Sequence, residues 1–250
     1  MVDLFIRLLL SYILLSAHSN ALGEQINQDV SGSKSTVIGK NTGPITITNR
    51  YDVLKIDLEM VVLPSLHIAM GKYEVTQGQW SQVMGHNPVT SDKYDCVNDK
   101  CPVVNVGYND ILAFIEQLNQ RTGNHYRLPN EEEWYAACQS KRWPGEQSSE
   151  LCGGSNSDID KVAWYYSNVP LGKAHPVGEK IPNFWGLYDM SGNVDEWTSS
   201  CMNPSICDLH VFRGGSINDS VEGLLSTQRN TVEPESGGTS HVGFRLAQDL

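Results

Sequence analysis

The sequence predicts an α+β domain made largely of irregular loops. Three segments have the apolar spacing of helices, and the chain beyond Lys141 is rich in turns, with only short extended runs between them. A length of 250 residues suits one domain or two small ones with a sizeable core. Six Trp, ten Tyr and five Phe supply the large apolar surfaces of such a core and exclude a disordered chain.

Two helices are predicted in the first half of the chain. One covers about Gln77–Met84 and follows a capping box, in which the Thr76 hydroxyl and the Gln79 amide satisfy free backbone N–H groups. The other runs from about Asn109 to Gln120, with apolar residues at i, i+3, i+4 and i+7, and ends at Gly123.

A third helix is predicted to begin at Asn130. The Glu131–Glu133 run in its first turn suits the positive end of the helix dipole, which favours a capping role over a metal or acid/base cluster. Extended runs follow much later, at Val211–Arg213 and Val242–Leu246.

Residues 1–21 have the features of a secretory signal peptide. Arg7 precedes an apolar run from Leu8 to Leu15, and the small residues at 19–21 offer a cleavage site. A membrane span takes roughly 20 apolar residues, more than this run provides. We therefore expect a secreted or periplasmic protein with no membrane span after signal removal.

Residues 22–50 form a separate segment rich in Ser, Thr, Asn and Gly. Its alternating stretches at 35–38 and 44–48 are predicted to be strands that pair with each other or with another subunit, which would make an oligomer through this segment. The alternative is a partly ordered linker. The domain boundary is placed near residue 50, so that residues 51–250 form the globular domain.

The charge of the chain excludes one class of partner. The formal net charge is −11, and Lys and Arg are not clustered. Binding to nucleic acid requires clustered basic residues against the phosphates, so we expect no nucleic-acid partner.

The six cysteines are predicted to form disulfides, because an exported chain with an even number of cysteines favours disulfides over metal ligation. Their spacing suggests three local pairs, namely Cys96–Cys101, Cys138–Cys152 and Cys201–Cys207. None of these pairs has the Cys-x-x-Cys spacing typical of zinc sites, and a free reactive cysteine would leave an odd partner.

Residues 185–197 gather oxygen-bearing side chains. Asp189, Asn193, Asp195 and Glu196 lie within eight residues, around a glycine that permits a sharp turn at Gly192. Calcium takes about six to eight oxygen ligands from such loops. The alternative is a turn in which Asp and Asn bond to nearby backbone groups.

A series of motifs occurs in the order seen in the sulfatase-modifying factor family, which comprises the formylglycine-generating enzymes and their bacterial relatives. The motifs are Glu74–Thr76, Pro102–Val106, Tyr126–Trp134, His175–Gly178, Gly186–Trp197, Arg213–Ser216 and Gly243–Arg245. The chain from about Asp57 to Leu250 resembles this family. The resemblance implies the family fold, a variant of the C-type-lectin-like fold with little regular secondary structure.

The resemblance also implies a calcium site in the same loop. Its ligands would be the side chains of Asp189 and Glu196 and the backbone carbonyls of Met190, Gly192 and Val194. Asp195 replaces the aromatic residue usual in the family and adds a charge whose role the sequence leaves open.

The oxidase apparatus of the family does not carry over. Formylglycine-generating members have a cysteine pair downstream of the Gly-Gly-Ser motif, which binds copper(I) and activates oxygen to oxidise a substrate cysteine. Here Gly214–Ser216 is followed by Ile217, and no cysteine occurs in residues 208–250. Copper(I) held in that way requires thiolates, so copper is not expected.

Two function classes follow. In the first, the protein is a binding module that presents residues 217–238 to a protein, peptide or glycan, since this segment has the polar composition of variable contact loops. In the second, it is an exported oxidase or maturation enzyme of the family, of the formylglycine-generating or siderophore-maturation type. Its candidate catalytic residues are Ser216, Asn218, Arg229 and Glu233. The alternative for Arg229, as for Arg245, is a structural one, in which the guanidinium ties loops together.

Overall fold

The computed structural model describes residues 56–89, 96–139, 150–153, 158–169, 172–233 and 240–250, together with the backbone of residues 24–26 and 37–40. The chain divides into two compact units, Met1–Tyr51 and Asp52–Leu250. Within the described ranges, no helix combines the length and the apolar character needed to cross a bilayer.

In the first unit, β1 (Glu24–Ile26) pairs antiparallel with β2 (Val37–Lys40). The strand predicted at 35–38 therefore overlaps β2. The second predicted strand, at 44–48, and the predicted signal peptide at 1–21 lie outside the described residues.

The second unit contains two small sheets. The first is antiparallel and has the order β3-β4-β10-β5, with the bounds Met60–Leu63, Ile68–Gly71, Ala247–Asp249 and Tyr126–Arg127. The second has the order β8-β7-β6-β9, with the bounds Asn230–Val232, His210–Arg213, Asp195–Cys201 and Val242–Phe244. Its β6 and β9 are parallel, and its other pairs are antiparallel. Both predicted extended runs thus contain strands.

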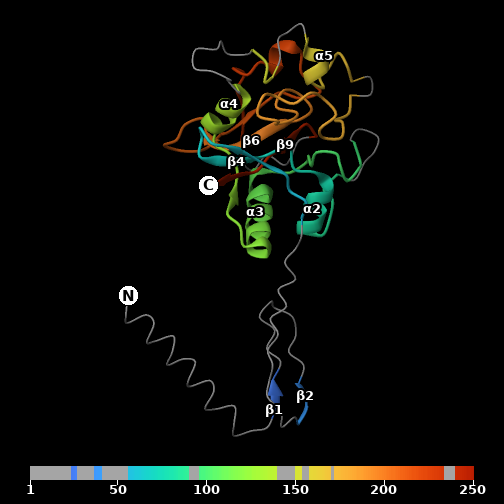
Figure 1. Ribbon diagram of the computed structural model, residues 1–250, viewed down its shortest axis with the longest axis vertical. Helices are drawn as coiled ribbons and strands as arrows, with labels where there is room; N and C mark the ends of the chain where they lie inside the picture. The colour runs from blue at the N-terminus through green and yellow to red at the C-terminus, as the bar shows by residue number, and fades with distance from the viewer. Residues whose placement is uncertain are drawn as a thin grey trace. The chain divides into compact units, whose positions relative to one another are not determined.

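The helices of this unit lie on both sides of the strands. They are α2 (Gln77–Met84), α3 (Tyr108–Thr122), α4 (Glu131–Gln139) and α5 (Ile159–Val162), with a 3-10 turn η2 at Val221–Leu224. Figure 1 shows α2 and α3 on one side of β4, β6 and β9, and α4 and α5 on the other.

The three predicted helices are confirmed. The capping box of α2 forms as expected, since Gln79 N donates to Thr76 Oγ1 at 3.2 Å and Thr76 N donates to Gln79 Oε1 at 2.9 Å. Gly123 ends α3 in the left-handed region, at φ 72°, where glycine has no steric penalty.

An aromatic cluster joins α2, α3 and β9 in the main core. The rings of Trp80 and Phe114 stack with centroids 5.1 Å apart, and Phe244 meets Phe114 edge-on at 5.5 Å. All three side chains are buried, so this cluster fixes α2 and α3 against the second sheet.

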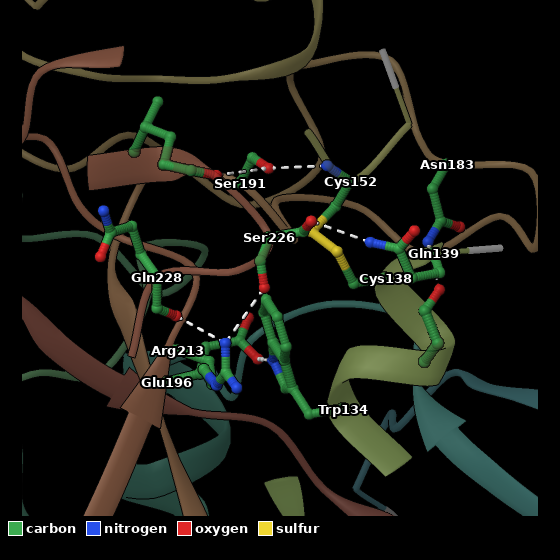
Figure 2. Close-up of a disulfide and its surroundings, with 12 residues drawn as sticks. Trp134, Cys138, Gln139, Cys152, Asn183, Ser191, Glu196, Arg213, Ser226 and Gln228 are labelled. Carbon is green, nitrogen blue, oxygen red and sulfur yellow. Dashed lines mark hydrogen bonds between the residues drawn. A yellow bond between two sulfur atoms is a disulfide. The ribbon is translucent and has the colours of Figure 1, made fainter. Parts of the chain in front are cut away.

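The three predicted disulfides are present, and among the six cysteines none is free. Cys138–Cys152 is the buried one, and it joins the end of α4 to the chain at 150–153. Figure 2 shows its surroundings, where Asn183 Nδ2 donates to the Ala137 carbonyl at 2.9 Å and Cys152 N donates to Ser191 Oγ at 3.0 Å. The disulfide and these hydrogen bonds anchor α4 to the loop that carries the predicted calcium ligands.

Candidate functional site

The loop that leads into β6 takes an unusual backbone path. Asp189, Gly192 and Asn193 all have positive φ, at 56°, 80° and 62°. A Cβ at Gly192 would lie 2.2 Å from the Trp164 carbonyl oxygen, so only glycine fits there. Asn193 N also donates to that oxygen at 2.8 Å, which holds the turn in place.

A buried ion pair lies directly behind this loop. The side chains of Glu196 and Arg245 both have zero exposure, and Arg245 contacts the carboxylate through both Nε and Nη2. Trp134 Nε1 donates to Glu196 Oε2 at 2.6 Å, and Arg245 Nη1 donates to the Gly71 carbonyl at 3.0 Å. The sequence-predicted structural role for Arg245 therefore agrees with its contacts.

Two further carboxyl groups lie in the same buried region. Glu74 accepts from Asn193 Nδ2 at 2.7 Å and from Val194 N at 3.2 Å. Burial raises the pKa of Glu74 well above its usual range, and the charges of Asp189 and Glu196 raise it further. The sequence did not assign Glu74 to the site, although it opens one of the family motifs.

Asp189 is the least satisfied member of this cluster. Its Oδ2 accepts from Gly178 N at 2.7 Å, whereas its buried Oδ1 has no hydrogen-bond partner among the described residues. Burial raises the pKa of Asp189 to about 6, against the lowering effect of the Gly178 N–H. Glu196 is thus the ion-pair partner of Arg245, and the charge of the same guanidinium also favours ionisation of Glu74 and Asp189.

The structure brings the predicted calcium residues together in this buried region. Asp189, Met190, Gly192, Val194 and Glu196 are all buried in one continuous turn. Glu196 accepts three N–H groups and keeps capacity for one more contact, whereas Asp189 Oδ1 accepts none and is the most open carboxylate oxygen of the two. Because a buried carboxylate oxygen is costly without a partner, the cluster has the charge and the donor type that suit a hard cation.

Asp195 links this loop to the Gly-Gly-Ser motif. Its Oδ1 accepts from Gly215 N at 3.0 Å. Burial raises the pKa of Asp195 to about 8, and the charge of Asp219 contributes. The residue that departs from the family pattern therefore has a structural contact, because its carboxyl group fixes the turn at Gly214–Ser216.

The candidate catalytic residues lie at and beyond this turn. Ser216 is fully buried, and its hydroxyl donates to Asp219 Oδ2 at 2.8 Å. Asn218 N donates to Ser216 Oγ at 3.3 Å, and the Asn218 side chain is exposed. These contacts bring Ser216 and Asn218 together in a local turn, while Glu233 lies exposed just after β8.

Arg229 is held by a glutamate of α4. Its Nε donates to Glu131 Oε1 at 2.7 Å, and Arg213 Nε donates to the same oxygen at 2.9 Å. Burial opposes ionisation of Glu131, but the hydrogen bonds and charges of the two arginines outweigh it and lower its pKa. Glu131 thus has a pairing role that its position in the first helical turn did not reveal, whereas Glu133 forms the expected capping contacts with Asn130.

Hydrogen bonds from α4 and Arg213 also fix the chain at residues 226–228, where it becomes exposed. Gln139 Nε2 donates to Ser226 Oγ at 2.8 Å (Figure 2). Arg213 Nη1 donates to the carbonyls of Ser226 and Gln228 at 3.0 and 2.6 Å. The chain at residues 226–228 is therefore bound to α4 and β7, while the side chains of Thr227, Gln228 and Arg229 are exposed.

The described domain is an α+β unit of two small sheets, with a loop of buried carboxyl groups before β6. The family model described as "Sulfatase-modifying factor enzyme 1-like domain" matches residues 34–250. The chain belongs to the sulfatase-modifying factor family. The predicted family is thereby confirmed.

Two named relatives are similar to this chain over part of its length. A protein named chaperone protein LppX from Paenibacillus barcinonensis is 31% identical over 173 residues, which is 51% of this chain and 60% of the relative. The inactive C-alpha-formylglycine-generating enzyme 2 of Mus musculus is 30% identical over 187 residues, which is 69% of this chain and 56% of the relative. The chain spans less than two thirds of the length of these relatives.

A solved structure supports the fold. The structure titled Treponema denticola variable protein 1 superposes with a TM-score of 0.66 at 22% identity and covers 91% of this chain and 99% of that one. The predicted fold class, the formylglycine-generating-enzyme fold as a lectin-like α+β variant, is confirmed.

Proposed function

We propose that this protein is an exported binding module, whose contact surface for a protein, peptide or glycan centres on residues 217–238. The state of the cysteines carries the proposal. All six are paired in disulfides, and none lies in residues 208–250. A copper(I) site downstream of Gly214–Ser216 would need thiolates that the chain does not supply there. Relatives named as a chaperone and as an inactive enzyme support the same conclusion.

The described part of this segment has the properties of a recognition surface. Its exposed side chains are polar, namely Asn218, Ser220, Glu222, Thr227, Gln228, Arg229 and Glu233. Ile217 and Leu224 are buried beneath them. Tyr166 N donates to the Asp219 carbonyl at 3.1 Å, and Ser226 N donates to the Glu150 carbonyl at 2.7 Å. A fixed backbone reduces the ordering cost of binding.

Export is supported by two independent features. Residues 1–21 have the pattern of a signal peptide. Three disulfides in one domain suit an oxidising compartment, whereas cytosolic thiols are kept reduced.

We further propose that the Asp189 loop holds calcium. Asp189 Oδ1 and Glu196 would supply carboxylate oxygens, and Met190, Gly192 and Val194 would supply carbonyls. The partnerless Asp189 oxygen and the excess of buried carboxyl groups support this proposal. Calcium bound there would balance charge and stiffen the turn that precedes β6.

The oxidase alternative is tested by oxygen consumption. The purified full chain is reconstituted with copper(I) and given a cysteine-containing sulfatase peptide, and a copper-loaded formylglycine-generating enzyme serves as positive control. We expect oxygen uptake no greater than that of copper and peptide alone. Turnover that yields formylglycine would establish the oxidase class and reject the binding-only proposal.

The binding surface is tested on a glycan array and a peptide display library. We expect the wild-type chain to select ligands, and the triple variant Asn218→Ala, Gln228→Ala, Glu233→Ala to lose them. The matched control is Glu116→Ala with Gln120→Ala, which removes exposed polar side chains from α3. Equal loss in both variants, or no selection by the wild type, would contradict the assignment of this surface.

A further inference from the structure

A second group of possible metal ligands lies where β6 ends and β7 begins. Cys201 is the last residue of β6 and His210 the first of β7, and the strand register pairs them directly. Cys207 lies in the connecting loop and forms the disulfide with Cys201. One ligand atom from each of Cys201, Cys207 and His210 lies within 4.8 Å of the others.

We infer that Cys201, Cys207 and His210 form a site for a thiophilic metal ion, Zn(II) or Cu(I), when the disulfide between the two cysteines is reduced. The site is distinct from the Asp189 loop, whose oxygen ligands suit a hard cation. Its two cysteines precede residue 208, so they are not the cysteine pair that formylglycine-generating members carry downstream of the Gly-Gly-Ser motif.

Each of the two sulfur atoms lies near a different nitrogen of the His210 imidazole. His210 Nε2 lies 3.7 Å from Cys207 Sγ, and Nδ1 lies 4.0 Å from Cys201 Sγ. In a tetrahedral zinc site, with Zn–S of about 2.3 Å and Zn–N of about 2.0 Å, a ligand sulfur and nitrogen are about 3.5 Å apart. A histidine binds a metal through one nitrogen, so one sulfur already lies near ligand spacing, and the other must approach that same nitrogen from within 4.8 Å.

The two sulfur atoms need the larger change. Two thiolates on one tetrahedral zinc lie about 3.8 Å apart, whereas a disulfide bond is about 2.05 Å long. Cleavage of the bond removes that restraint. Cys207 is exposed in a loop, so it is the sulfur that can move, while Cys201 is held by its strand.

The imidazole is fixed in position by aromatic packing. His210 is 6% exposed, and its ring stacks on Tyr108 with centroids 3.6 Å apart. Trp197 packs edge-on against the same imidazole, with ring centroids 6.4 Å apart. A ligand held in one orientation loses little entropy when the metal binds.

The electron and proton balance of the switch is simple. A phosphine or a dithiol supplies two electrons and, with solvent, two protons, and the disulfide becomes two thiols. Metal binding then displaces both thiol protons, because the thiolate is the ligand. Three protein ligands leave one position of a tetrahedral zinc open. In the oxidised protein the two sulfur atoms are bonded to each other and provide no thiolate, so no metal is expected to bind.

The other two disulfides provide internal controls. Cys138 and Cys152 are buried, at 0% and 4% exposure, so we expect a reductant to reach them more slowly than the exposed Cys207. Cys96 and Cys101 belong to no comparable three-ligand group in the described ranges. The double variant Cys96→Ser, Cys101→Ser removes one disulfide, as Cys201→Ser, Cys207→Ser does. Only the second variant is expected to lose metal binding.

The test is a competition titration of the full chain. After anaerobic reduction with a phosphine and its removal, Zn(II) is titrated against a chromophoric chelator, and Cu(I) is titrated separately against bathocuproine disulfonate. We expect one equivalent of metal bound by the reduced wild type and by the Cys96/Cys101 variant, and none by the oxidised protein or the Cys201/Cys207 variant. Tight binding of either ion in its arm supports the site and identifies its metal. Absence of binding in both arms overturns the inference.

The histidine is tested in two ways. His210→Gln should weaken binding at least about tenfold, since mutation of a residue that only orients a metal ligand already costs about 10–100-fold. Unchanged affinity in that variant would overturn the three-ligand site. Since His210 is buried and its variant is a folding risk, X-ray absorption on the zinc-loaded wild type gives an independent reading. We expect two sulfur ligands and one imidazole, and sulfur ligands without imidazole contradict the inference.

Discussion

Arg245 and Glu196 form an ion pair with no solvent exposure on either side, across 49 residues of chain. The guanidinium also donates to the carbonyls of Gly71 and Tyr188, so it joins β6, the end of β4 and the loop before Asp189. Removal of one member of a buried pair leaves the other charge uncompensated, which costs far more than loss of a surface pair.

Arg245→Met is therefore expected to lower the free energy of unfolding by about 3–5 kcal/mol, as measured by urea denaturation. Lys161→Met is the matched control, because its pair with Asp158 is exposed on both sides. We expect the control to change stability by about 0.5 kcal/mol or less. Similar losses in the two variants would show that the buried pair has no special role.

Gly192→Ala is expected to destabilise the protein strongly. The new Cβ would meet the Trp164 carbonyl at 2.2 Å in addition to the cost of positive φ, so we expect a loss of about 3 kcal/mol or more. Gly186→Ala is the control, since Gly186 has φ +86° and no heavy atom within 4 Å of the added Cβ. Only the conformational cost of about 1–2 kcal/mol is expected there. Thermal unfolding of both variants checks the difference, and equal losses would argue against the close approach.

Calcium is expected to stabilise the wild type and to lose its effect in Asp189→Ala. At a free concentration about 100 times its dissociation constant, a ligand that binds only the folded state adds about 2.7 kcal/mol. Melting curves with calcium and with a chelator measure this shift. Asp158→Ala removes an exposed carboxylate and should keep the full response. A calcium response in Asp189→Ala equal to that of the wild type would reject the loop as the binding site.

Glu131→Gln is expected to remove part of the acid sensitivity of the fold. The pKa of Glu131 is lowered in the folded state, because Arg229 and Arg213 outweigh the effect of burial. The unfolded state then binds more protons, so this stabilisation is complete above the ordinary glutamate pKa of 4.5 and is lost as pH falls through the lower folded value.

At neutral pH, Glu131→Gln should cost about 2 kcal/mol, the worth of hydrogen bonds to charged groups. Urea denaturation between about pH 3 and pH 7 checks both effects. The exposed neighbour Glu132→Gln makes the same charge change without these partners and should follow the wild-type profile. An unchanged pH profile in Glu131→Gln would contradict the pairing.

Local sequence rules predicted three helices, two extended runs and the three disulfides correctly. The capping box at Thr76, the left-handed end at Gly123 and the pair Cys201–Cys207 each depend on groups within a turn or a short loop. Such groups meet whenever the local backbone forms, so their spacing alone is informative. The order of the motifs along the chain also predicted the family and its fold correctly.

The tertiary structure alone decided which distant groups meet. Glu74 and Asn193 are 119 residues apart, and Arg213 and Glu131 are 82 apart, yet each pair forms a hydrogen bond. No local periodicity encodes such contacts, because they depend on how the strands and loops cross in space. The sequence by itself determined three of the helices, the cysteine pairs and the oxygen-rich loop at Asp189. Only the fold decided that three buried carboxyl groups lie within reach of one guanidinium charge and that His210 lies beside two sulfur atoms, since burial and strand register bring those groups together.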